Sequence, residues 1–169
     1  MRCLVVMTLI FTSPLFSQYS KPNPKLTPGV VDTTIEADLN GRSYIIDGVE
    51  HNICAPYFRT SPFRSATKSE KIKTAVCRAY GITTGGPGSA WELDDILPIE
   101  MGGKNVQANL WPQPIKEARV KDHQVEDLLG GPKGLICRGK ISLANAQRCI
   151  ITDWVTCAAR VKTLEGVVR

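Results

Sequence analysis

Residues 91–114 read WELDDILPIEMGGKNVQANLWPQP, and this stretch decides how the rest of the chain is interpreted. Residues 91–99 form a strand-like run, the Gly-Gly pair at 102–103 marks a turn, and residues 109–111 resume the strand pattern. Pro98 inside the first run predicts an irregular edge or a bulge, because proline cannot donate to a strand ladder. We therefore expect an antiparallel hairpin here.

Helical patterns flank this hairpin on both sides. A helix is expected over 115–129, where the Gly-Gly-Pro at 130–132 stops it. A second is expected after Ser142, which can cap it, because the apolar residues that follow recur at spacings of three and four. An earlier helix should begin at a capping box over 67–70 and end before Gly81. The fold class is therefore α+β.

The bulk composition is that of one ordinary globular domain. The chain has 169 residues, of which 43% are hydrophobic and 22% are charged. These values exclude long disorder, collagen and coiled coils. The formal net charge of +5 suits a polyanionic partner, and it suits a slightly basic protein without such a partner equally well.

The first 40 residues carry two further signals. Arg2 precedes an apolar run over 3–11, which predicts a signal peptide over 1–17 and a secreted or periplasmic protein. The alternative is a buried N-terminal strand. The run is shorter than the roughly 20 residues of a membrane-spanning helix, and no other stretch is able to span a membrane. Prolines are frequent after it and predict an extended arm over 18–40, followed by a domain over 41–160.

Five cysteines remain after the predicted signal peptide, and none forms a C-x-x-C pair. A structural zinc site is therefore not expected. An exported chain can keep disulfides, but the odd number leaves at least one thiol free or paired between chains. The alternative is five reduced, buried cysteines.

Asp94 and Asp95 are adjacent carboxylates within a largely apolar strand pattern. Two carboxylates buried together are costly unless they face a cation or water. The alternative is one exposed carboxylate and one that caps a turn. The pair is therefore a candidate site that the residues alone do not decide.

The same stretch resembles the core of the HNH (ββα-metal) endonucleases, which combines Asp-His, a short run to Pro, a Gly-Gly turn and Asn-Leu. It resembles more closely a group of small exported bacterial HNH-domain proteins. Their core reads like ELDHLIPLELGG…NLWPQP, followed by a Lys-Asp helix and a helix like LAEAQRAIATDW. The resemblance covers roughly residues 26–155. The matching segments of this chain are 26–30, 52–54, 92–103, 109–114, 121–122, 143–148 and 152–154.

This resemblance implies a ββα-metal core over 91–129 and roles for particular residues. Asp94 takes the position of the metal ligand. The general-base histidine is replaced by Asp95. Asn109 takes the position that supports the loop orienting the base, and His123 is the candidate third ligand from the following helix. The resemblance also favours a disulfide between Cys54 and Cys137.

The implied cofactor is one divalent cation, with Mg²⁺ favoured over Mn²⁺ or Zn²⁺. Such a cation neutralises phosphoryl oxygens and helps the leaving oxygen depart. Asp95 would be a poorer base than histidine, since its ordinary pKa is about 3.9 and general-base catalysis is typically worth about 10²–10⁴-fold. Alternatively it is a second ligand. That requires a distorted strand, because adjacent strand residues point to opposite faces.

The implied partner is nucleic acid, with DNA favoured over RNA. Lys116, Arg119 and Lys121 lie on the predicted helix after the hairpin and would give non-specific, salt-sensitive affinity for a phosphate backbone. The alternative is a solvated helix face, since acidic residues are interleaved with them. His51 is either a replacement base or a packing residue.

Three functions follow as hypotheses, and whether the chain is an enzyme stays open among them. The first is a metal-dependent HNH-type endonuclease that hydrolyses phosphodiester bonds. The second is a catalytically impaired relative that binds nucleic acid or a partner outside the cell. The third is a disulfide-stabilised scaffold.

Overall fold

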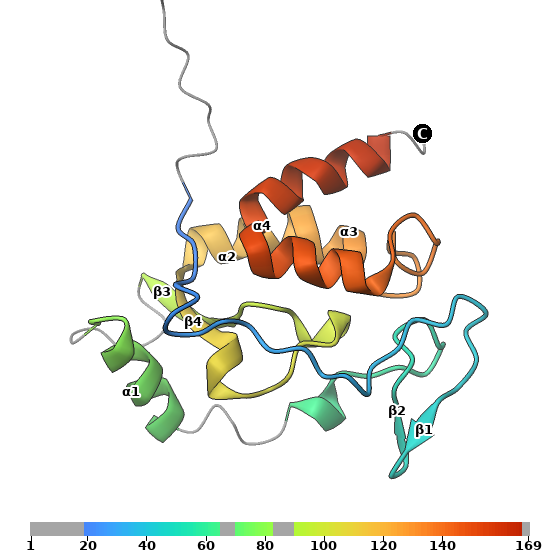
Figure 1. Cartoon of the computed structure of the whole chain (residues 1–169), viewed down its shortest axis with the longest axis horizontal. Helices are drawn as coiled ribbons and strands as arrows, with labels where there is room; N and C mark the ends of the chain where they lie inside the picture. Colours follow the sequence, from blue (N-terminus) through green and yellow to red (C-terminus); the bar gives the residue numbers. More distant parts are fainter. Residues whose placement is uncertain (1–18, 65–69, 83–89, 167–169) are drawn as a thin grey trace, which may run out of the picture.

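The computed structural model describes residues 19–64, 70–82 and 90–166. This part of the chain is a mixed α+β structure with two small antiparallel sheets and several helices (Figure 1). The expected α+β class is therefore confirmed. Within the described residues, no helix combines the length and the apolar character needed to cross a membrane.

The hairpin is present, with β3 at Trp91–Asp95 and β4 at Leu110–Pro114. The first strand is shorter than expected: it ends at Asp95, and a 3₁₀ turn at Ile99–Met101 follows. The second strand is longer than the expected stretch over 109–111, because it continues through two prolines. A two-stranded sheet tolerates them, since each strand has one unpaired edge where a missing N–H costs nothing.

The helix after the hairpin has three consecutive parts. These are α2 at Ile115–Lys121, a π-helical turn at Asp122–Glu126 and α3 at Asp127–Leu129. The expected helix over 115–129 is confirmed in its bounds, and the π-helical turn is an addition. π-Helical turns widen the helical repeat and are frequent at functional sites.

The register of the hairpin divides its side chains between two faces. Glu92 and Asp94 lie opposite Gln113 and Trp111 and therefore share one face, while Leu93 and Asp95 share the other. The leucine face packs against α1 at Glu70–Ala79, in a small cluster of Val76, Leu93 and Leu110. The other face is turned toward α2.

The capping box expected over 67–70 lies at the start of α1, and its first three residues lie outside the described residues.

The main core lies where the helix after the hairpin packs against α4 at Leu143–Gly166. Ser142 caps α4 as expected: its Oγ accepts a hydrogen bond from the Asn145 N–H at 3.3 Å. The helix is kinked at Asp153, where φ is −166° and ψ is 95°, and Figure 1 shows the change of direction. The Asp153 carboxylate accepts hydrogen bonds from the N–H groups of Val155 and Thr156, so it caps the second half of α4.

A disulfide between Cys149 and Cys157 spans this kink. In a straight helix, residues eight apart would be about 12 Å apart. Their Cα atoms are 5.3 Å apart. The kink at Asp153 is therefore what brings the two cysteines within bonding distance.

The N-terminal arm runs along the hairpin loop and α4 (Figure 1, blue). Gly29 donates to the Ala108 carbonyl, and Val31 forms an antiparallel bridge with Gly103. Ile35 lies in the main core. The arm is therefore packed into the same unit as residues 41–160.

The second sheet is the hairpin of β1 at Ile45–Ile46 and β2 at Val49–Glu50. Its turn is Asp47-Gly48, and both residues have positive φ values of 49° and 78°. The left-handed conformation explains the choice of Asp and Gly at these two positions.

Candidate functional site

The buried ammonium of Lys121 is the centre of the candidate site. Its Nζ donates hydrogen bonds to Asp94 Oδ2 at 2.9 Å, to the Asp95 backbone carbonyl at 2.8 Å and to Glu126 Oε1 at 2.6 Å. The Lys121 side chain is 1% exposed. A buried ammonium needs such partners, because an uncompensated charge is very costly in the protein interior. Lys121 therefore ties the end of β3 to the helix behind the hairpin.

The two carboxylates share one positive charge, and the pKa values of Lys121 and Glu126 are shifted from their ordinary values. Burial opposes a charge on Lys121, but attraction by Asp94 and Glu126 outweighs it, and the pKa of Lys121 is raised. Burial also raises the pKa of Glu126 to about 7, against the attraction of Lys121 and with repulsion from Asp94. The lysine is therefore charged at neutral pH, and Glu126 is the group in this cluster that titrates near pH 7.

Asp122 is a neighbouring helix residue whose carboxyl group is repelled by Asp94. Burial, followed by repulsion from Asp94, raises the pKa of Asp122. His123 is 74% exposed, and its Nδ1 lies 2.9 Å from Asp127 Oδ2 on the solvent side of the helix. The structure therefore does not bring His123 to Asp94, where the metal-ligand interpretation required it.

The side chains of Asp95, the expected base, and Asp94, the expected metal ligand, project from opposite faces of the hairpin. Asp94 is paired with Trp111 and Asp95 with Leu110, so the strand is regular through both carboxylates. Asp95 is buried, on the face that packs against α1. Only its backbone carbonyl reaches the Lys121 ammonium. The distortion that would let the two side chains share one cation is not present.

Asn109 holds the loop that follows Asp95. Its Oδ1 accepts hydrogen bonds from the N–H groups of Leu97 at 3.1 Å and Val30 at 3.2 Å, and its Nδ2 donates to the Leu97 carbonyl at 2.8 Å. The side chain is completely buried. Asn109 thus lies where a loop-supporting residue must lie, and it also fastens the N-terminal arm to that loop.

The residues around Asp94 do not fit a resident divalent cation. No three His, Cys, Asp or Glu side chains in the described ranges lie close enough together to hold a metal ion. The oxygen atoms that face the centre of the site are hydrogen-bonded to the Lys121 ammonium. A cation bound to these atoms would have to displace a buried positive charge. Metal binding by this chain therefore remains a prediction.

The three basic residues on the predicted binding helix are placed differently. Lys116 and Arg119 are exposed, and Arg119 Nη1 lies 3.4 Å from Asp122 Oδ2. Lys121 is enclosed by its carboxylate partners, so the expectation that it contacts a phosphate backbone is corrected. A surface of two basic residues remains on this helix.

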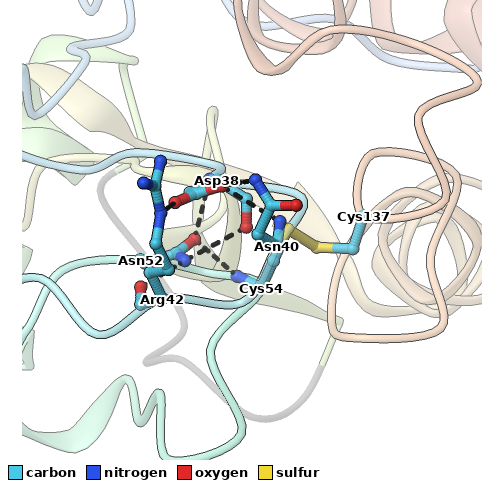
Figure 2. Close-up of a disulfide and its surroundings, with 6 residues drawn as sticks. All are labelled: Asp38, Asn40, Arg42, Asn52, Cys54 and Cys137. Atoms are coloured by element: carbon cyan, nitrogen blue, oxygen red, sulfur yellow. Dashed lines mark hydrogen bonds and ion pairs between the residues drawn. A yellow bond between two sulfur atoms is a disulfide. The ribbon is translucent and has the colours of Figure 1, made fainter.

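The expected disulfide between Cys54 and Cys137 is present, with a Cα–Cα distance of 5.4 Å (Figure 2). It joins the segment after β2 to the loop before α4. Beside it, the buried Asn52 amide accepts from the Cys54 N–H and donates to the carbonyls of Asp38 and Arg42. Cys77 is the free cysteine among the described residues.

His51 is a packing residue in this structure. Its ring packs edge-to-face against Phe63, with centroids 5.1 Å apart, and its Nδ1 lies 2.9 Å from Thr34 Oγ1.

Two features of the observed site were not identified from the sequence: Glu126 as a member of the site, and Lys121 as a buried cation. The available signal was an acidic pair on a strand with a Lys on the following helix, which also describes many surface ion pairs.

Comparisons with protein family models, with curated proteins and with solved structures find no match to this chain.

Proposed function

We propose that this protein is a relative of the HNH nucleases that binds a nucleic-acid backbone without hydrolysing it. The observation that carries the proposal is the hydrogen bond between the Lys121 ammonium and Asp94, the carboxylate expected to hold the catalytic metal. A general base is also lacking at the neighbouring position, where Asp95 replaces histidine on the opposite face of the hairpin. One-metal phosphodiester hydrolysis needs both groups on one phosphate.

The features of an HNH-type scaffold that do not require a metal support the relationship. The hairpin is followed directly by a helix, and Asn109 supports the loop after Asp95. The disulfide that the resemblance favoured joins Cys54 and Cys137. These features account for the arrangement of the core without any hydrolytic step.

Binding is assigned to the solvent-facing cations of α2. Lys116 and Arg119 are exposed one helical turn apart, and the chain carries a net charge of +5. Exposed cations neutralise phosphates and release counterions, so the affinity should fall steeply with salt. The carboxylates of Asp94 and Glu126 are paired with the buried Lys121 ammonium and are not part of this binding surface.

The first test measures binding of a fluorescent DNA duplex by anisotropy. We expect binding that weakens as salt is raised, with a smaller salt slope in the double variant Lys116→Glu/Arg119→Glu. The matched control is Lys133→Glu/Lys140→Glu, which reverses two exposed lysines in the loop before α4. Equal losses in both double variants would show that net charge, and not the α2 surface, carries the binding.

The second test is plasmid cleavage with Mg²⁺ or Mn²⁺. We expect no cleavage by the wild-type protein. Cleavage that disappears in Asp94→Ala would overturn the proposal and restore the metal-dependent endonuclease. Cleavage that appears only in Asp95→His would identify the histidine replacement, rather than Lys121, as the cause of inactivity.

A further inference from the structure

The ammonium of Lys121 is surrounded in the way that proteins surround a hard cation. Its three hydrogen-bond acceptors are two carboxylate oxygens, from Asp94 and Glu126, and one backbone carbonyl, from Asp95. Carboxylate and carbonyl oxygens are the ligands that Mg²⁺ and Ca²⁺ take in proteins. The acceptors come from both halves of the unit, the end of β3 and the helix behind it.

The backbone is adapted to this arrangement. Glu126 lies five residues after Lys121, whereas side chains on one face of an α-helix are three or four residues apart. The residues that follow Lys121 form the π-helical turn, whose wider repeat brings the Glu126 carboxylate to the Lys121 ammonium. The helix therefore departs from regular geometry at the segment that places a second carboxylate on the ammonium.

A further oxygen donor lies on the same face of the hairpin. Gln113 is completely buried on the face that carries Asp94. It lies opposite Glu92, in the next residue pair along that face. Neither its Oε1 nor its Nε2 has a hydrogen-bond partner in the described part of the chain. Buried amides are rarely left in this state, so a polar neighbour such as a hydrated ion would have a donor and an acceptor to bind.

We propose that Lys121 is an internal replacement for a metal ion, and that removing its ammonium opens a divalent-cation site formed by Asp94, Glu126 and the Asp95 carbonyl. When Glu126 is ionised, the two carboxylates carry two negative charges, whereas the lysine supplies one positive charge. A divalent cation would neutralise both carboxylates, and the space left by the lysine side chain would admit its water ligands. The inference does not depend on whether the protein binds nucleic acid.

The experiment compares thermal unfolding in EDTA with unfolding in millimolar Mg²⁺, Ca²⁺ or Mn²⁺. The wild-type Tm should be unchanged by the cations. Lys121→Ala should have a lower Tm in EDTA and regain several degrees in at least one cation, because a ligand that binds only the folded state stabilises it. The double variant Lys121→Ala/Glu126→Gln should lose this gain. Lys116→Ala, on the exposed side of the same helix, should behave as the wild type.

Two further measurements keep the outcome decisive. If Lys121→Ala is unfolded in EDTA, folding induced by a cation, followed by circular dichroism, is the expected result. Lys121→Gln removes the charge with a smaller change in volume and provides a folded second variant for calorimetric titration. The proposal is overturned if the wild-type protein gains as much stability from a cation as Lys121→Ala, or if neither Lys121 variant responds to any of the three cations.

Discussion

Asn109 satisfies three backbone groups with one buried side chain. Replacing it by alanine would leave the N–H and carbonyl of Leu97 and the N–H of Val30 without their partners. Unsatisfied buried groups cost about 1–3 kcal/mol each, so we expect Asn109→Ala to lower the free energy of unfolding by at least about 2 kcal/mol. Urea denaturation measures the loss. The control is Asn145→Ala, an exposed residue whose replacement should change stability by less than about 0.5 kcal/mol.

Glu126 gives the folded protein a pH dependence near neutrality. Its pKa is about 7 in the folded state and 4.5 in its ordinary environment, so between these values the folded state binds the extra proton. The raised pKa means that stability is greatest below the unfolded pKa and falls as the pH rises toward 7, by up to about 1.4 kcal/mol per pH unit.

Glu126→Gln should remove this slope. Urea denaturation at intervals from pH 4.5 to pH 7.5 measures it, with the exposed Glu36→Gln as the matched variant that keeps the wild-type profile. A profile for Glu126→Gln as steep as that of the wild type would assign the titration to another group.

For single residues, the sequence indicates which side chains are important more reliably than it indicates which of them are buried. The resemblance to the HNH group pointed to Asn109 through the Asn-Leu-Trp-Pro-Gln string, and it favoured the Cys54–Cys137 pair because the resembled group has cysteines near both places. It did not identify the burial of Lys121, since a lysine beside acidic residues on an amphipathic helix has the same sequence pattern when it is exposed. Its burial depends on the π-helical turn and on the hairpin register, which are tertiary features.

At the scale of elements, the kink in α4 depends on Asp153. Its carboxylate caps the second half of the helix and pairs with Lys21 of the N-terminal arm. Asp153→Ala should cost about 1 kcal/mol or more, as expected for a lost N-cap. Asp153→Asn keeps the cap and loses the ion pair, which is worth less than about 1 kcal/mol at a partly exposed position. Thermal unfolding should therefore rank Asp153→Asn above Asp153→Ala, and equal losses in the two variants would show that the ion pair dominates.

The presence of these helices and strands could be predicted from the sequence pattern, but the bend within a helix could not. The hairpin, the helix after it and α4 were expected from apolar spacing, turn residues and caps. The kink at Asp153 was not expected, because Leu143, Ile150 and Trp154 keep helical spacing across it. The disulfide between Cys149 and Cys157 was missed for the same reason, since eight residues of straight helix hold two cysteines too far apart to bond.

At the scale of the whole molecule, the two disulfides within the described residues should contribute unequally to the free energy of unfolding. Cys54–Cys137 closes a loop of 83 residues and Cys149–Cys157 a loop of eight. Loop-closure entropy then predicts losses of about 4–5 and about 2–3 kcal/mol on removal. We expect Cys54→Ala/Cys137→Ala to lower the midpoint of guanidinium denaturation more than Cys149→Ala/Cys157→Ala. Equal midpoints would show that loop entropy does not govern their contributions.

The contact between the N-terminal arm and α4 has a consequence for biosynthesis. The Trp154 indole N–H donates to the Ser20 carbonyl 134 residues earlier, and the Tyr19 ring packs against the same indole. A ribosome releases the first of these partners long before the second, and long-range contacts form late because the intervening chain must first be ordered. The polypeptide therefore cannot reach its native state until most of its translation is complete.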